Sequence, residues 1–189
     1  MVSVQVTLIL LSVVVVNGLE SSRLWNIPSP VNGFRIQPLL GRWFVQYRKA
    51  PCTWGGSNEF SDYETTFQLD GKHNLFTTMS MRNDVCNTIN SRAFMQSPGV
   101  YIIKDPLGNN FSGKLVFAAT DYKTYHITYL CTKMSVLGEK CDDTSLSVKT
   151  RVPHPDHKII ARINHALNQM WGISVDHLQR VNHLQCKSS

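Results

Sequence analysis

The segment Gly41-Arg42-Trp43-Phe44-Val45-Gln46-Tyr47-Arg48, reached through Pro38-Leu39-Leu40, constrains the fold more than any other stretch. A glycine permits a tight turn where a Cβ atom would clash. Side chains alternate between the two faces of a strand, so the run that follows is typical of β-structure. We expect Gly41 to begin a strand and Trp43 to point inward and close one end of a β-barrel. A strand with one buried tryptophan is the alternative, and the rest of the chain decides between them.

Residues Met1 to about Gly18 have the pattern of a secretory signal peptide. An apolar run from Val4 to Val16 precedes the small residues of a cleavage site. This run is too short for a convincing membrane span, and no second apolar segment follows it. Cleavage leaves residues 19–189, a suitable size for a single domain. The sequence therefore predicts a secreted, extracellular protein with no membrane insertion.

The formal net charge of +6 is spread over the chain, with no run of like charge longer than Arg48-Lys49. Scattered basic residues favour a solvated surface over a nucleic-acid interface. The five cysteines of a secreted chain indicate two disulfides and one free thiol. None of their spacings gives the Cys-x-x-Cys of a zinc site, so we expect no metal site.

Eight short runs with strand character follow one another along the chain. The turns between them include Asp70-Gly71 and Ser97-Pro98-Gly99, whose glycines tolerate positive φ. Strands at such intervals are typical of an antiparallel barrel or sandwich. The expected strands are Trp43–Lys49, Phe60–Leu69, Leu75–Met81, Thr88–Met95, Val100–Ile103, Lys114–Ala119, Tyr125–Thr132 and Ser145–Arg151.

After Pro153 the hydrophobic pattern changes to the period of a helix. Asp156 lies in the expected first turn and Gly172 at the end. One terminal helix after eight strands predicts a helix laid against the outside of a closed barrel, followed by an extended tail from Ile173 to Cys186. The apolar residues that mark the helix are Ile159, Ile160, Ile163, Leu167 and Met170.

Three separated motifs, read together, resemble those of the lipocalin family. They are Gly41-Arg42-Trp43, the Thr120-Asp121-Tyr122 turn, and Arg151 at the end of the last strand. The resemblance implies an all-β fold: an eight-stranded antiparallel up-and-down barrel with one C-terminal α-helix packed outside. An arginine in this place can lie over the indole of Trp43 and donate to backbone carbonyls, which would close the barrel floor.

Finer matches are Asp84-Val85-Cys86 with Cys186 in the tail, the segment from Cys131 to Cys141, and Pro51-Cys52-Thr53-Trp54. They resemble the lipocalin group that contains alpha-1-microglobulin, complement eight gamma chain and plasma retinol-binding protein, and alpha-1-microglobulin most of all. This resemblance implies the disulfides Cys86–Cys186 and Cys131–Cys141, and it leaves Cys52 free. Cys52–Cys186 is the alternative pairing, since other lipocalins tie the tail near the second strand.

An eight-stranded barrel is wide enough to hold one small ligand. Alternation from Trp43 places Val45 and Tyr47 on its inner face, and in the sixth strand the bulky alternate pair is Leu115 and Phe117. These four residues are candidate ligand contacts.

In the seventh strand, hydrophobicity alone selects Ile127 and Tyr129 as the inner residues. The resemblance implies the reverse, with these two side chains under the terminal helix. Polar groups above an apolar base favour an amphipathic ligand over a pure hydrocarbon. The residues that the resemblance turns inward are His126, Thr128 and Leu130, and in the eighth strand Ser145, Ser147 and Lys149.

Cys52 has two interpretations. A thiol at the barrel mouth, made more acidic by Arg48 and Lys49, would react, attach a ligand or join a partner protein. The alternative is a thiol that is buried under its loop or paired differently. The resemblance associates such a thiol with haem binding and reduction helped by nearby lysines. The corresponding positions here hold Ile103, Thr132 and Ser147, with Lys104, Lys133 and Lys149 only nearby, which puts that activity in doubt.

No enzymatic activity is expected. Leu40 to Phe44 also resemble prostaglandin D synthase, but Tyr63-Glu64-Thr65 occupy the region of its catalytic cysteine. The chain shows no Ser/His/Asp or paired-carboxylate motif. His126 is a candidate axial haem ligand, although a histidine held by hydrogen bonds inside the barrel is commoner. We therefore assign no cofactor.

Asn110-Phe111-Ser112 is an N-glycosylation sequon in an expected hairpin, as in a secreted glycoprotein. The sequence as a whole predicts a secreted lipocalin that binds and transports a small hydrophobic or amphipathic ligand. The alternatives are an interaction subunit disulfide-linked to a larger protein through Cys52, and a thiol-dependent haem or radical scavenger.

Overall fold

The computed structural model describes residues 26–50, 61–71, 74–82, 85–104, 112–134 and 140–184. Four predictions lie outside these ranges: the signal peptide, the free Cys52, glycosylation at Asn110, and the pairing of Cys186. Cys86 is disulfide-bonded, and its partner also lies outside the described ranges.

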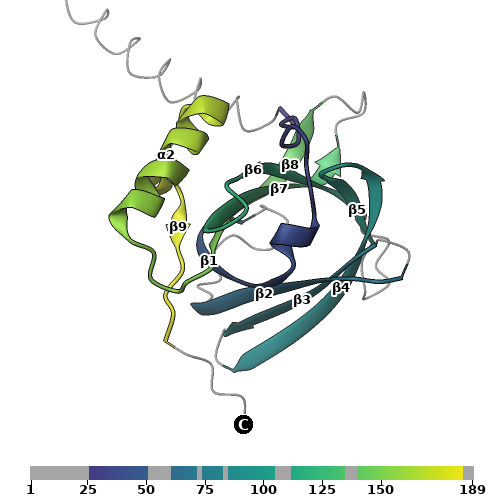
Figure 1. The fold of residues 1–189 in the computed structure, drawn as a ribbon, viewed down its shortest axis with the longest axis horizontal. Coiled ribbons are helices and arrows are strands. Elements are labelled where there is room, and N and C mark those ends of the chain that lie inside the picture. The colour runs from purple at the N-terminus through teal and green to yellow at the C-terminus, as the bar shows by residue number, and fades with distance from the viewer. Residues whose placement is uncertain are drawn as a thin grey trace, which may run out of the picture.

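The strands form one closed antiparallel barrel (Figure 1). Each strand from β2 to β7 pairs with the next one, β8 pairs with β1, and β1 pairs with β2 to close the ring. The predicted eight-stranded up-and-down barrel is confirmed. The elements are β1 (Gly41–Lys49), β2 (Ser61–Leu69), β3 (Leu75–Arg82), β4 (Cys86–Ser97), β5 (Val100–Lys104), β6 (Ser112–Thr120), β7 (Tyr125–Met134), β8 (Cys141–Thr150), α2 (His157–Trp171) and β9 (Gln179–Arg180), with short 3-10 helices η1 (Gln37–Leu39) and η3 (Val175–His177).

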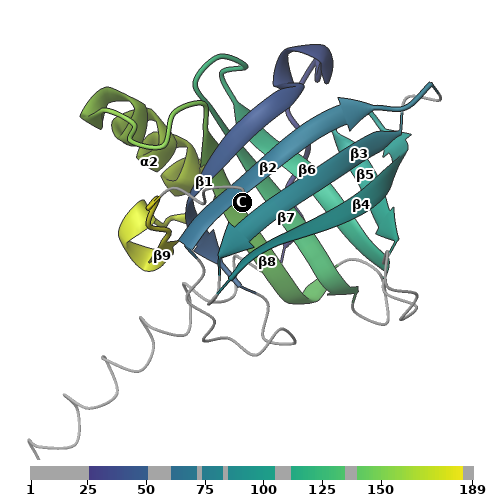
Figure 2. The same ribbon diagram turned by 90° about the horizontal axis from the view of Figure 1, so that it is seen from below.

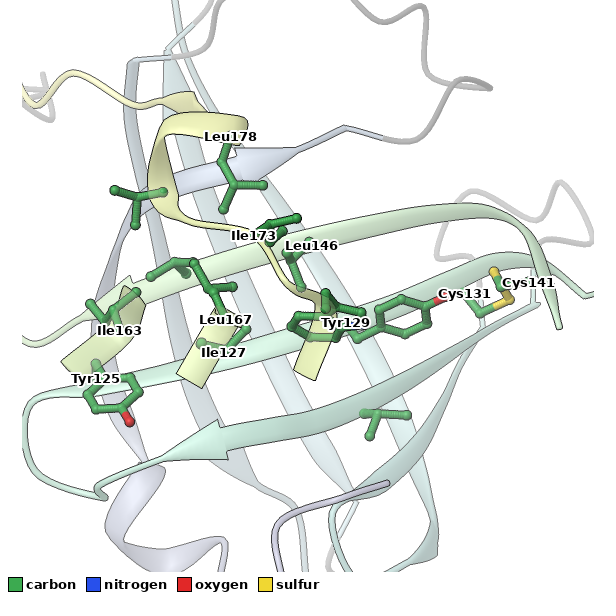
Figure 3. Packing of buried hydrophobic residues seen from close by; sticks show 14 of the residues in the cluster. Tyr125, Ile127, Tyr129, Cys131, Cys141, Leu146, Ile163, Leu167, Ile173 and Leu178 are labelled. Carbon is green, nitrogen blue, oxygen red and sulfur yellow. A yellow bond between two sulfur atoms is a disulfide. The ribbon is translucent and has the colours of Figure 1, made fainter. Parts of the chain in front are cut away.

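The helix α2 lies beside the barrel, as the sequence predicts (Figures 1 and 2). It begins after Asp156, whose carboxylate accepts a hydrogen bond of 2.9 Å from the N–H of Ile159. Its apolar face covers the outer surface of β7 and β8 (Figure 3). We call this packing the outer cluster; its members include Tyr125, Ile127, Tyr129, Leu146, Val148, Ile163, Leu167 and Trp171.

The helix ends at Gly172, which has φ +71° and ψ +23°. Its N–H donates to the carbonyl of Asn168 at 2.9 Å. A side chain in this left-handed conformation is strained.

We expect Gly172→Ala to lower the free energy of unfolding by about 1 kcal/mol, as measured by urea denaturation. Ala166→Gly is the control, because alanine is preferred to glycine inside a helix, whereas glycine is preferred at the left-handed position of Gly172. A neutral effect of Gly172→Ala would show that the strain argument is wrong.

The eighth strand begins earlier than predicted, at Cys141 instead of Ser145. The predicted disulfide Cys131–Cys141 is confirmed, with the two Cα atoms 5.6 Å apart. It joins β7 to β8 next to the pair Met134–Cys141. The polar residues Asp142 and Asp143 give this part of the strand no hydrophobic pattern in the sequence. The disulfide and the pairing with β7 hold it in the sheet.

The sequence predicts an extended C-terminal tail, and this prediction is wrong in part. Residues Val175–His177 form a 3-10 helix, because Ser174 and His177 cap each other's backbone N–H groups. The two-residue strand β9 then pairs with Tyr47 and Arg48 of β1.

The tail continues along the gap where β2 leaves β1. The N–H of Val181 donates to the carbonyl of Gln46 at 2.8 Å, and the N–H of Asp62 donates to the carbonyl of Asn182 at 2.7 Å. The tail therefore completes the edge of β1 that β2 covers only as far as Phe44.

Candidate functional site

The closed end of the barrel is built on Trp43, which is fully buried. Its Nε1–H donates to the carbonyl of Leu39 at 2.7 Å. The guanidinium carbon of Arg151 lies 3.7 Å from the indole centroid. Arg151 also donates to the carbonyls of Arg42 and Pro38 at 3.0 and 2.7 Å. This stacked and hydrogen-bonded arginine closes the floor.

Replacing Arg151 tests how much this closure contributes. We expect Arg151→Met to lower the free energy of unfolding by about 2 kcal/mol, because a cation–π contact and two charge-assisted hydrogen bonds are lost. Arg151→Lys should recover less than half of that loss, since an ammonium lacks the flat fork of a guanidinium. Chemical denaturation measures both variants; full recovery by lysine would show that charge alone matters.

The turn after β6 joins the floor to the helix. The carboxylate of Asp121 accepts hydrogen bonds from the N–H groups of Lys123, Thr124 and Tyr125. Burial on its own raises the pKa of Asp121, but the hydrogen bonds, chiefly from Thr124, outweigh it and hold the pKa below its usual value. Arg162 of α2 donates to the same carboxylate at 2.9 Å.

Immediately above the floor lies a layer of aromatic rings. His126 lies among them, 4.3 Å from Trp43, 5.5 Å from Phe67 and 5.7 Å from Phe117, measured between ring centroids. It is fully buried. Neither ring nitrogen has a hydrogen-bond partner within the described part of the chain. The expectation of a hydrogen-bonded histidine is therefore wrong there: packing alone holds the ring.

The electrostatics of this layer depend on Lys149. Burial first, and then the charges of Lys149 and Arg151, lower the pKa of His126 well below its usual value. The Nζ atom of Lys149 donates to the hydroxyl of Thr128 at 2.8 Å and lies 5.8 Å from the ring centroid of Phe67. Burial lowers the pKa of Lys149 to about 7.

Alternation holds along the first half of β1 and then fails. Val45 pairs with Lys149 and faces inward. The pairing register then shifts between Val45 and Tyr47. Tyr47 consequently pairs with Val148 and packs against the outer cluster. The prediction that Tyr47 faces the ligand is wrong, because a bulge reverses the direction of the side chains.

The structure places the other predicted contacts that lie in its described ranges on the inner face. Leu115 and Phe117 belong to the inner core, and Leu130 packs against it. Ile127 and Tyr129 lie under α2 in the outer cluster. The neighbours of β7 on β8 follow the same register, through the pairs His126–Lys149, Thr128–Ser147 and Leu130–Ser145.

Exposure of the inner side chains rises away from the floor along β7 from His126 to Leu130, and along β8 from Lys149 to Ser145. In β7, His126 is fully buried, Thr128 is 3% exposed and Leu130 is half-buried. In β8, Lys149 is 6% exposed, whereas Ser147 and Ser145 are half-buried. The interior is thus closed at Trp43, and its side chains on β7 and β8 are more exposed away from this floor.

The sequence alone does not indicate which residues of β2 and β3 face the barrel interior. Thr65 pairs with Trp43 and with Met79, which turns all three side chains the same way. The hydroxyl of Tyr63 donates to the sulfur of Met79 at 3.4 Å. Tyr63, Thr65 and Phe67 alternate along β2 and so lie on one face of the strand. Their mixed polarity does not show in the sequence whether this face is the inner one.

The described residues contain no group of three or more His, Cys, Asp or Glu side chains placed to hold a metal ion. No helix in the described ranges is long and apolar enough to cross a bilayer.

Comparison with solved structures agrees with this geometry. The crystal structure of the major allergen Per a 4 from cockroaches matches with a TM-score of 0.67 at 15% sequence identity, over 84% of this chain and 94% of that one. The fold is lipocalin-like. No protein-family model and no curated protein matches the sequence. The specific resemblance to alpha-1-microglobulin therefore stays a prediction.

Proposed function

We propose that this lipocalin-like protein is secreted and carries a small hydrophobic or amphipathic molecule in its barrel. The observation that carries the proposal is the rise in exposure along the inner faces of β7 and β8, from a sealed floor to an open end. Barrels of eight strands have room for one small ligand at such an end. In this proposal the protein binds its ligand without transforming it and needs no cofactor.

The inner surface supports an amphipathic ligand. Apolar side chains that face inward yet stay partly exposed are Met79, Ile103 and Leu130. Hydroxyl groups of Ser145 and Ser147 line the same region by their pairing. Small-molecule sites typically combine an apolar lining with a few polar groups that fix orientation.

The proposal is tested by measuring saturable ligand binding, and by a substitution that fills the barrel interior and should weaken that binding. An apolar fluorescent probe such as anilinonaphthalene sulfonate should bind the native protein, and Leu130→Trp should weaken that binding about tenfold or more by filling the interior. Val152→Trp adds the same side chain at a residue that is 44% exposed outside the barrel and should leave binding unchanged. Mass spectrometry of the native secreted protein would then identify its cargo. A panel of lipids of different classes should be tested by displacement of the same probe. If no lipid binds, or if Leu130→Trp and Val152→Trp change probe binding equally, the proposal is refuted.

A further inference from the structure

We propose that the deep end of the interior binds the carboxylate of an amphipathic acid, with Lys149 as its cationic partner. This inference rests on the carrier function proposed above and names the chemical class of the cargo. The acid group would lie low in the barrel and the apolar part would extend toward the open end.

Lys149 is a buried cation whose pairing is incomplete. It faces inward from β8 between Val45 and His126. An ammonium has three N–H donors, yet within the described ranges Lys149 makes a single hydrogen bond, to Thr128, and no ion pair. A buried charge without a counter-charge is strongly unfavourable unless a partner arrives. A carboxylate supplies both the opposite charge and the missing acceptors.

Two neighbouring side chains have unused hydrogen-bonding groups as well. Both ring nitrogens of His126 and the hydroxyl of Thr65 are buried without a partner in the described part of the chain. Thr65 lies two residues along β2 from Phe67, whose ring centroid is 5.8 Å from the Lys149 ammonium. Neutral imidazole offers one N–H donor and a hydroxyl offers another. The inner face at this end of the barrel therefore holds two unused donors besides those of Lys149.

The charges around Lys149 favour an anion. Arg151 lies beneath it at the floor, and Arg48, 5% exposed, lies above it on β1. Asp143, on the same strand, is six residues away toward the open end, about 20 Å along an extended chain. The other carboxylates closest along β2 are already paired: Asp62 with Arg82 and Glu64 with Arg42.

The interior above Lys149 provides for the rest of such a ligand. The inward side chains of Met79, Ile103 and Leu130 are apolar and keep partial exposure. A flexible hydrocarbon chain or a ring system would bury these surfaces while its acid group reached the lysine. This orientation distinguishes the proposal from a charge contact at the rim.

The experiment compares dodecanoate with dodecanol, which share the chain and differ in the head group. Isothermal titration calorimetry should give an affinity for the acid about tenfold or more above that for the alcohol, because only the acid forms charge-assisted hydrogen bonds. Lys149→Met should abolish this preference by weakening acid binding about tenfold, with alcohol binding unchanged within about threefold. Lys158→Met makes the same replacement at an exposed residue of α2 and should keep the full preference.

The outcomes separate this inference from the carrier function. Equal binding of acid and alcohol by the native protein, or an acid preference that survives Lys149→Met, overturns the carboxylate site and leaves the carrier function standing. Binding of neither ligand overturns the carboxylate site, and the lipid panel above then decides the carrier function. Lys149→Gln, which keeps a polar group without the charge, should behave like Lys149→Met; circular dichroism verifies that both variants fold.

Discussion

Replacing Trp43 with alanine should lower the free energy of unfolding by about 4 kcal/mol, more than any other single truncation proposed here. The side chain is fully buried and packs edge-on against His126, with ring centroids 4.3 Å apart. Its loss leaves a cavity and removes the hydrogen bond to the carbonyl of Leu39. It also takes away the surface on which Arg151 lies. Urea denaturation followed by far-ultraviolet circular dichroism measures the change.

Trp43→Phe is the matched control, since it keeps an aromatic ring and loses the Nε1 donor. We expect it to be destabilised by about 1–2 kcal/mol. Combining Trp43→Ala with Arg151→Met should be clearly less than additive, because both substitutions remove the same stacked contact. An additive double variant would contradict the view that the two residues act as one floor.

The barrel itself was predictable because its evidence is local or repeats along the chain. Gly41 and Trp43 adjoin each other in sequence, and the alternation of each strand depends only on that strand. The helix was predictable for the same reason, with Asp156 at its start and Gly172 at its end. The contact between Arg151 and Trp43 could not be predicted from local sequence, since only the resemblance to the family pattern relates the two residues.

The seventh strand shows where hydrophobicity misleads. Ile127 and Tyr129 are the more apolar set, yet they face outward, because α2 buries that side. Both faces of β7 are covered, so polarity cannot distinguish inside from outside. The resemblance to a family with an external helix supplies the missing information and leaves the inner face to His126 and Thr128.

Tyr47 could not be placed from the sequence because its direction is set by distant groups. The register shift lies at Gln46, whose carbonyl accepts from Val181 and whose side chain donates to the carbonyl of Val152 at 3.2 Å. Both partners are more than a hundred positions away. Strand alternation holds only while the pairing is regular, and the contacts of Gln46 with Val152 and Val181 lie at the point where it stops.

The sequence also places Lys149 inside the barrel without revealing its isolation. Its register follows from β7, but the shortage of partners depends on which side chains meet it from β1, β2 and β7. Only the three-dimensional arrangement shows one hydrogen bond, to Thr128, for a nearly fully buried ammonium. This is the observation from which both the carboxylate site and the final prediction follow.

Lys149→Met should stabilise the ligand-free protein at neutral pH. Burial lowers the pKa of Lys149 from 10.5 to about 7, so folding must either strip a proton or bury a charge. At about 1.4 kcal/mol per pKa unit the penalty is of order 4 kcal/mol, and the lost Thr128 hydrogen bond offsets about 1 kcal/mol of the gain. Methionine has a similar length and fits an apolar layer. We expect a net gain of about 3 kcal/mol in denaturation at pH 7.

The pH dependence gives this prediction its sign. The lysine is a base whose pKa is lower in the folded than in the unfolded chain, so its penalty is constant below about pH 7, shrinks as pH rises, and vanishes above pH 10.5. The stability difference between Lys149→Met and the native protein should follow that course. Comparing the two at each pH cancels the titrations that are the same in both proteins, such as those of Tyr101 and Arg151. The titration of His126 is not among them, because the charge of Lys149 helps to lower its pKa. Lys158→Met should show a flat difference within about 0.5 kcal/mol.

A gain at pH 7 that disappears near pH 10 would mean that the native protein retains a destabilising group in its interior. Stability and acid binding should then oppose each other at Lys149, because the same unpaired charge weakens the empty barrel and attracts a carboxylate. Saturating dodecanoate should accordingly raise the unfolding free energy of the native protein more than that of Lys149→Met. A variant that gained no stability at neutral pH would show that the ammonium is already compensated, and the argument for a missing anion would fail with it.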